Sequence, residues 1–195
     1  MGDILFHGEK YVSLATGTKV SRNHGFPNVL DMAWQMGRIC RWTGAGEFFW
    51  SDMLHSFVVA DLVSEPWLKC HALIHDGCEC VGNDVPSPVK SDETRKIEHA
   101  IMERTWHGLG LWRLNAAEEA VIKVADNRAR NGEAWVIGND GNRGSYPDRD
   151  KEAEYLVTMY LNDFPYTQTI ERGGQGPREF LKRYHEYWRL AQSGS

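Results

Sequence analysis

The feature that most constrains this chain is an imidazole and a carboxylate that stand side by side after an apolar run. His75 and Asp76 directly follow Ala72-Leu73-Ile74, and a second carboxylate, Glu79, comes three residues later. A charge among apolar side chains is costly unless it is paired or bound to a metal. Adjacent His and Asp at the end of a buried helix can both reach one ion, and on a continuing helix Glu79 shares their face. We therefore expect a metal site here, with Glu79 as a nearby acid/base.

Two more polar residues interrupt apolar helical faces. His55 lies in a helical segment near 52–63, and Asp126 ends the run Val121-Ile122-Lys123-Val124-Ala125-Asp126. Taken singly, such residues are more often a hydrogen-bonded core histidine, a helix cap or an ion-pair partner. If the helices pack as a bundle, both converge with His75 and Asp76. Two imidazoles and two carboxylates suit a divalent Co, Mn, Zn, Fe or Ni ion better than calcium.

Length and charge limit the class of protein. A chain of 195 residues fits one domain with a proper core, and the formal net charge of −5 argues against a nucleic-acid polymer as partner. No apolar run approaches the ~20 residues of a membrane span, and Met1 to Tyr11 lack the pattern of a signal peptide. We expect a single domain over 1–195, in the cytoplasm, with no membrane partner and a small anionic ligand.

The cysteines favour a reducing compartment. Cys40, Cys70, Cys78 and Cys80 contain one Cys-x-Cys pair, whereas a zinc ribbon needs two pairs at suitable spacing. Ordinary reduced thiols are the expectation, and a metal or redox role is the alternative.

Hydrophobic periodicity predicts a mostly α fold with a small N-terminal β-hairpin. The hairpin is expected within 4–20, from the β-like stretches Ile4-Leu5-Phe6 and Tyr11-Val12-Ser13-Leu14. Asn115 with Glu118 resembles a capping box at a helix start. The polar stretch 138–148 is expected to be a surface loop or lid, and 81–90 a loop. The expected helices run over about 28–43, 52–63, 66–80, 91–106, 115–130, 151–163 and 177–192.

These residues resemble a known pattern. His55, then His75-Asp76 after an apolar run, then Asp126 in a Lys-x-x-Asp context are similar to the HD-domain metal-dependent phosphohydrolases. The run His75-Asp76-x-x-Glu79, continued by Asp84-x-Pro86-x-Pro88-Val89-Lys90, resembles bacterial 5'-deoxynucleotidases and phage dATP triphosphohydrolases. The segment from Arg38 to His55 is similar to the phage branch. The resemblance covers roughly 25–130, the expected core, and leaves the C-terminal helices of 151–192 outside it.

The resemblance implies a fold and a set of roles. It implies an HD-domain helical bundle with His55, His75, Asp76 and Asp126 as metal ligands. It implies that Glu79 orients or deprotonates the attacking water. Asp84 is a candidate for a second catalytic or sugar-contacting carboxylate, and a loop-capping role is equally open because Asp is a common turn residue.

Three cations and one aromatic residue are candidates for substrate binding. Arg41 stands beside Trp42 at the end of the first expected helix, and Lys90 precedes a helix N-terminus, a natural anion site. Lys123 is one turn before Asp126 and so on the same helical face. Taken singly, each cation is more often a solvated surface charge, but around a metal we expect the three to form a phosphate clamp, with a second Mg²⁺ on the phosphates as a further expectation. We expect Trp42, Trp34 or nearby aromatic residues to stack on a purine, and a place in the core is equally open for Trp42.

The predicted function is that of an enzyme acting on deoxynucleotides. The leading hypothesis is a phage-type dATP triphosphohydrolase that converts dATP to deoxyadenosine and tripolyphosphate, in the host cytosol if phage-encoded. The alternative is a 5'-deoxynucleotidase for monophosphates, and the second alternative is a non-catalytic nucleotide-binding sensor. We also expect a homo-oligomer, for which the C-terminal aromatic residues Phe180, Tyr184, Tyr187 and Trp188 offer a stripe, although such a stripe is more often intramolecular core.

Overall fold

The computed structural model describes residues 10–138, 140–146, 148–166, 171 and 174–193, with backbone only at 140–142. The described chain is mostly helical with one small antiparallel hairpin, as the sequence predicts. Its helices, with the short 3-10 turns η1 and η2, are α1 (Val29–Gln35), η1 (Arg41–Gly44), α2 (Asp52–Leu62), η2 (Pro66–Leu68), α3 (Lys69–Leu73), α4 (Glu79–Gly82), α5 (Asp92–Gly108), α6 (Ala116–Val136), α7 (Asp140–Ser145), α8 (Lys151–Asp163) and α10 (Gln175–Ser193).

The hairpin is short. Strand β1 (Val12–Ser13) pairs with β2 (Lys19–Val20), with Val12 opposite Val20. Gly17 in the turn has a φ of 86°, a left-handed conformation that glycine adopts without steric cost. The β-like stretch expected at 4–6 lies outside the described residues.

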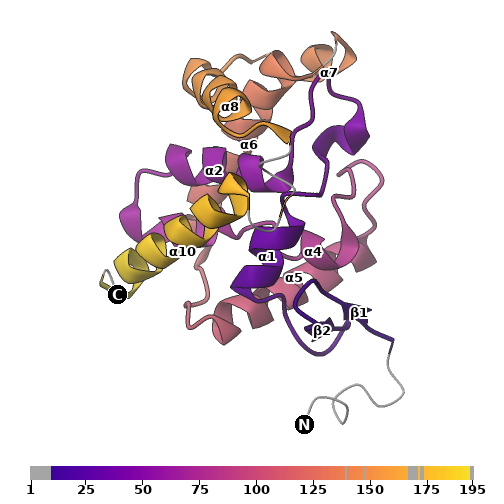
Figure 1. The fold of residues 1–195 in the computed structure, drawn as a ribbon, viewed down its shortest axis with the longest axis vertical. Helices are drawn as coiled ribbons and strands as arrows, with labels where there is room; N and C mark the ends of the chain where they lie inside the picture. Colours follow the sequence, from indigo (N-terminus) through magenta and orange to yellow (C-terminus); the bar gives the residue numbers. More distant parts are fainter. Residues whose placement is uncertain (1–9, 139, 147, 167–170, 172–173, 194–195) are drawn as a thin grey trace.

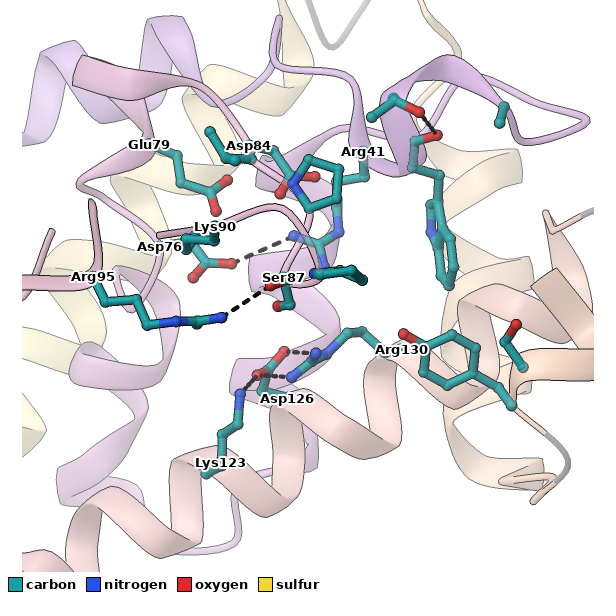
Figure 2. A pocket seen from close by; sticks show the side chains of 18 residues that line it. Arg41, Asp76, Glu79, Asp84, Ser87, Lys90, Arg95, Lys123, Asp126 and Arg130 are labelled. Carbon is teal, nitrogen blue, oxygen red and sulfur yellow. Dashed lines mark hydrogen bonds and ion pairs between the residues drawn. The ribbon is translucent and has the colours of Figure 1, made fainter. Parts of the chain in front are cut away.

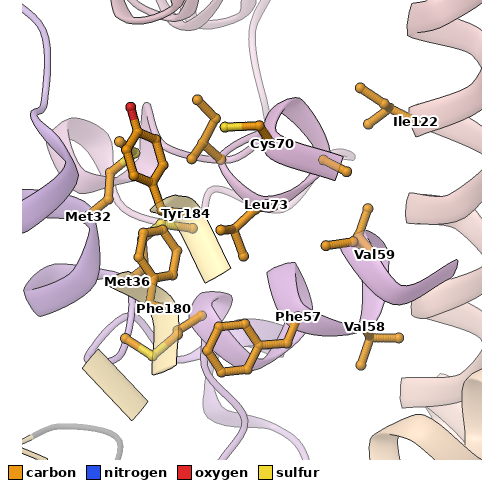
Figure 3. Packing of buried hydrophobic residues seen from close by; sticks show 14 of the residues in the cluster. Met32, Met36, Phe57, Val58, Val59, Cys70, Leu73, Ile122, Phe180 and Tyr184 are labelled. Carbon is orange, nitrogen blue, oxygen red and sulfur yellow. The ribbon is translucent and has the colours of Figure 1, made fainter. Parts of the chain in front are cut away.

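Helix α2 forms the centre of the core (Figure 1). Residues 52–60 and Leu62 are all buried, so this helix is covered on every side rather than along one apolar stripe. Phe57 faces Phe180 of α10, and Val59 faces α6 near Ile122 (Figure 3). Any polar side chain on α2 must therefore find its partners inside the protein.

The C-terminal helices close this core. Helix α8 packs against α6, and α10 lies across α1, α2 and α3 (Figure 1). Phe180, Tyr184 and Tyr187 on α10 are buried, and Trp188 packs against the core. The C-terminal aromatic stripe therefore serves the intramolecular core. One cluster of buried apolar side chains extends from Leu14 to Ala191.

The first expected helix is shorter than predicted. α1 ends at Gln35 instead of near Thr43, so Arg41 does not close that helix but starts the separate turn η1. Within η1, Trp42 and Thr43 have φ values of 59° and 53°. Left-handed backbone is unfavourable for such residues, and tertiary contacts of the Arg41 and Trp42 side chains hold it here.

The third expected helix is broken. Residues 66–80 divide into η2, α3 and the start of α4, and His75 and Asp76 occupy the turn between α3 and α4. Glu79 thus opens α4 rather than following His75 and Asp76 on one helix. The break is physically useful, because consecutive residues of a regular helix point about 100° apart. In the turn, both side chains reach the same space.

Two other boundaries differ from prediction. α6 begins at the expected capping box of Asn115 and Glu118, but it continues to Val136 rather than ending near Arg130. The 138–148 stretch contains the short helix α7, so it is not loop throughout. The helix expected over 151–163 has those bounds as α8, and α4 extends to Gly82 in the expected 81–90 loop.

Two further sequence expectations concern the membrane and the thiols. Every helix of the described chain is too short or too polar to span a bilayer. All four cysteines are free, and Cys70, Cys78 and Cys80 are buried. Burial raises the pKa of the Cys70 thiol to about 12, so it stays protonated at neutral pH.

The close packing of α6 against α8 predicts that Gly132 cannot accept a larger side chain without loss of stability. A Cβ at Gly132 would lie 2.7 Å from the carbonyl carbon of Ala153 on α8. Gly132→Ala should therefore destabilise the protein by about 1–3 kcal/mol, the usual cost of overpacking. Denaturant unfolding checks this, with Gly82→Ala as the control because a Cβ there meets nothing within 4 Å. Equal stability of the two variants would contradict the close helix contact.

Candidate metal centre

Two histidine rings point their Nε2 atoms at the same space. His55 Nε2 lies 3.3 Å from His75 Nε2. The other ring nitrogens are held by oxygen acceptors: His55 Nδ1 lies 2.5 Å from Glu133 Oε1, and His75 Nδ1 lies 2.8 Å from the Ala72 carbonyl. Each Nδ1 is therefore the protonated donor, so Nε2 is the nitrogen of each ring that faces a metal.

Two carboxylates approach these nitrogens. Asp76 Oδ2 lies 3.1 Å from His75 Nε2 and 3.7 Å from His55 Nε2. From α6, Asp126 Oδ1 lies 3.3 Å from His55 Nε2. The nearby cationic groups and histidines outweigh burial and hold the pKa of both carboxyl groups well below the usual range. Both are therefore ionised, as metal ligands must be.

The spacing fits a transition-metal ion. Bonds of about 2.1 Å place neighbouring ligands of an octahedral ion about 3 Å apart. His55, His75 and Asp76 each offer an atom within 4.8 Å of the others, and Asp126 stands beside His55. Three of the predicted ligands, His55, His75 and Asp76, thus come together from α2 and the turn after α3, and Asp126 of α6 joins them through its contact with His55. Two nitrogens and two carboxylate oxygens form the mixed donor set that such an ion accepts.

In the metal-free protein the imidazole ring of His55 carries the positive charge at this site. Burial and Arg41 lower the pKa of His55, but Glu133 and Asp126 raise it more, so that it lies at about 9. His55 therefore bears a positive charge at neutral pH in the metal-free protein. This preference for positive charge between acidic groups is the electrostatic signature expected of a cation site.

Behind the histidines lies a buried charge network that the sequence does not predict. Glu133 on α6 is fully buried and, besides His55, accepts hydrogen bonds from Arg41 Nε at 3.3 Å and Trp42 Nε1 at 3.2 Å. Arg41 also donates to Asp52 at 3.2 Å and to Asp76 at 3.4 Å. Arg41 is thus tied to a metal ligand. The sequence does contain an indication of Glu133: it follows Asp126 by two helical turns, so both side chains lie on one face of the helix.

Glu79 belongs to a second acidic cluster. Glu79, Asp52 and Asp84 each offer an oxygen within 4.8 Å of the others. Glu79 is 5 % exposed, and its Oε2 atom has no hydrogen-bond partner among the described residues. Burial, with Asp76 and Asp52 close by, raises the pKa of Glu79 far above its usual value, and burial raises that of Asp52 to about 6. The metal-free protein therefore keeps a proton on Glu79 at neutral pH.

The two clusters open into one cavity of about 500 Å³, a size typical of small-molecule sites. It is lined by Asp76, Glu79, Asp84 and Asp126, and by the five cations Arg41, Lys90, Arg95, Lys123 and Arg130 among the described residues. Figure 2 shows Asp126 held between Lys123 and Arg130, and Arg41 bonded to Asp76. Lys90 forms an ion pair with Glu98 at 2.9 Å.

All three predicted cations line the cavity, and two further ones were missed. Arg130 follows Asp126 by one turn and binds it at 2.5 Å, so its helical spacing was a usable signal. Arg95 donates to the Ser87 carbonyl at 2.9 Å across the loop before α5. That placement depends on how the loop folds back, and no spacing in the sequence indicates it.

An aromatic pair lines another part of the cavity. Trp42, a predicted substrate contact, packs edge-to-face against Tyr146 with ring centroids 5.4 Å apart. Tyr146 follows α7, and its carbonyl accepts a hydrogen bond from Trp135. The polar stretch expected as a loop or lid therefore contributes a wall of the cavity. Tyr146 was missed because it comes more than a hundred residues after Trp42.

Comparisons with known proteins add nothing to this geometry. No family model matches the chain, and no curated protein matches its sequence. The resemblance noted from the motif residues remains a prediction.

The charge on His55 predicts how metal binding depends on pH. The ion must displace a proton from a group whose pKa is about 9 in the metal-free protein. The affinity for Co²⁺ should therefore rise about tenfold per pH unit from pH 6.5 to 8.5. Titration followed by Co²⁺ absorbance checks this, and calorimetry in buffers of different ionisation enthalpy should count one proton released. An affinity independent of pH would contradict the assignment of His55.

Proposed function

We propose that the protein is a metal-dependent phosphohydrolase of deoxynucleotides, most specifically a phage-type triphosphohydrolase that converts dATP to deoxyadenosine and tripolyphosphate. The observation that carries this proposal is the cluster of His55, His75 and Asp76, whose facing atoms lie 3.1–3.7 Å apart, with Asp126 at 3.3 Å from His55. The two aspartates of this set line a cavity together with five cations. Enzymatic activity itself is part of the proposal.

The residues present fit a divalent Co, Mn, Zn, Fe or Ni ion held by His55, His75, Asp76 and Asp126. When bound, such an ion would polarise a phosphoryl oxygen and lower the pKa of bound water towards about 7. A second cation, Mg²⁺, would accompany the phosphates.

Glu79 serves as the acid/base. The sequence resemblance gave it the role of orienting or deprotonating water. Its raised pKa favours proton donation instead, so we assign it the step that protonates the leaving 5'-oxygen. Asp84 lies beside it and faces the same cavity, which suits a sugar-contacting carboxylate.

The cations favour a triphosphate over a monophosphate. Arg41, Lys90 and Lys123 line the cavity with Arg95 and Arg130, more positive groups than a single phosphate needs. A triphosphate carries more negative charge and spreads it over a longer chain. Trp42 provides an aromatic surface for the base, worth about 1–3 kcal/mol where a base stacks on it.

The two alternatives remain a 5'-deoxynucleotidase, which needs the same metal centre with a shorter phosphate, and a nucleotide-binding sensor without turnover. The partner in each case is a small deoxynucleotide rather than a nucleic-acid polymer or a membrane. A cytoplasmic location and a homo-oligomeric state are part of the same proposal.

The three functions are separated by one assay. Purified protein with Co²⁺ or Mn²⁺ should release tripolyphosphate from dATP, detected by ion chromatography. Glu79→Gln should lose at least about 100-fold in kcat, a typical effect of removing a general acid/base, while Co²⁺ still binds. Activity confined to dAMP would select the monophosphatase. Binding of dATP without turnover would select the sensor.

A substitution at Lys123 tests whether the cations of the cavity bind the phosphates of the substrate, as the proposed phosphate clamp requires. Lys123→Ala should raise KM for dATP about three- to tenfold, because it removes one cation from the path of the phosphates. The effect on KM for dAMP should be smaller. Lys151→Ala is the matched control, since both lysines are exposed and both form an i,i+3 ion pair with a carboxylate. Equal effects of the two substitutions would remove Lys123 from the clamp.

A further inference from the structure

Glu133 contacts one residue of the proposed metal centre and two residues of the proposed substrate cavity. Its Oε1 atom binds the ring of His55, which belongs to the metal centre. Its Oε2 atom accepts from both Arg41 and Trp42, which belong to the substrate cavity. The carboxylate itself is fully buried and does not line the cavity. It can therefore act only through its neighbours.

The two oxygens belong to one rigid plane. A rotation of the Glu133 carboxylate that improves the hydrogen bond between Oε1 and His55 Nδ1 also moves Oε2, the atom that accepts from Arg41 and Trp42. Arg41 and Trp42 are adjacent in η1, where the left-handed backbone at Trp42 has to be held by contacts of its side chains. With its indole nitrogen bound to Glu133, Trp42 presents its ring to Tyr146 and to the cavity.

We propose that Glu133 is a positioning residue that couples the metal centre to the nucleoside end of the cavity. A metal ion on His55 Nε2 would hold the imidazole ring in one orientation and, through the Nδ1 hydrogen bond, the Glu133 carboxylate, which in turn orders Arg41 and Trp42. By linkage, a ligand on Trp42 must then strengthen metal binding by the same factor. The inference rests on the proposed function for the identity of that ligand, an adenine nucleoside.

The experiment uses a ligand that cannot touch the ion. 2',5'-Dideoxyadenosine lacks both phosphate and the 5'-oxygen, so any effect of metal on its binding must pass through the protein. Its affinity for the full-length protein is measured by calorimetry with and without saturating Zn²⁺. In the wild type we expect Zn²⁺ to tighten binding at least about fivefold, the lower range of allosteric coupling.

Glu133→Gln should remove this coupling. The glutamine amide can still accept from His55, but its NH₂ group then faces the Arg41 and Trp42 donors. We also expect Zn²⁺ affinity to fall about 10- to 100-fold, as for other residues that orient metal ligands. Asp61→Asn is the matched control: Asp61 also binds an arginine and an aromatic hydroxyl, Arg183 and Tyr160, but outside the cavity lining. It should leave Zn²⁺ affinity unchanged.

Trp42→Phe keeps the proposal testable if Glu133→Gln does not fold by circular dichroism. It retains an aromatic ring and removes the indole N–H donor together with part of the ring surface, so Zn²⁺ affinity should stay within about twofold while coupling falls below about twofold. A folded Glu133→Gln protein with wild-type Zn²⁺ affinity, or full coupling in Trp42→Phe, would overturn the inference. Neither result bears on whether dATP is hydrolysed, so the proposed function is judged separately.

Discussion

The short hydrogen bond between the buried side chains of His55 and Glu133 is the interaction on which the rest of the site depends. Both residues are completely buried, one on α2 and one on α6. Removing one partner of a buried ion pair costs about 3–5 kcal/mol, because the other charge is left without compensation. The bond therefore fixes the rotation of α2 relative to α6, and with it the position of Asp126.

The same constraint explains the irregular backbone around the cavity. Glu133 needs a second cationic partner, and Arg41 provides it only because α1 ends at Gln35 and η1 turns the chain back. On the other side, the break after α3 lets His75 and Asp76 face His55 together. In both places a helix that the sequence favours is interrupted where polar groups have to meet. Local helical preference amounts to less than about 1 kcal/mol per residue, whereas each buried charge left unpaired costs more.

Much of the architecture followed from local signals. The capping box at Asn115, the N-cap at Ser91 and the bounds of α8 were predictable because caps and periodicity act over a few residues. The four candidate metal ligands were predictable, since each puts a polar group on an apolar face. Glu133 was overlooked because α6 was expected to end near Arg130, although its spacing from Asp126 places both on one face. Asp52 was overlooked because an acidic residue in the first turn of a helix is ordinary.

The sequence by itself determined a mostly helical chain, the small hairpin, and the residue types from which a metal site can be built. The tertiary structure decided which of those residues meet, where α1 and α3 stop, that Glu133 and Tyr146 join the site from distant segments, and that Arg41 is bonded to Asp76. The reason is the range of the forces. Hydrogen bonds of caps and helices join neighbours in sequence, whereas the pairing of buried charges joins whichever segments the packed core brings together.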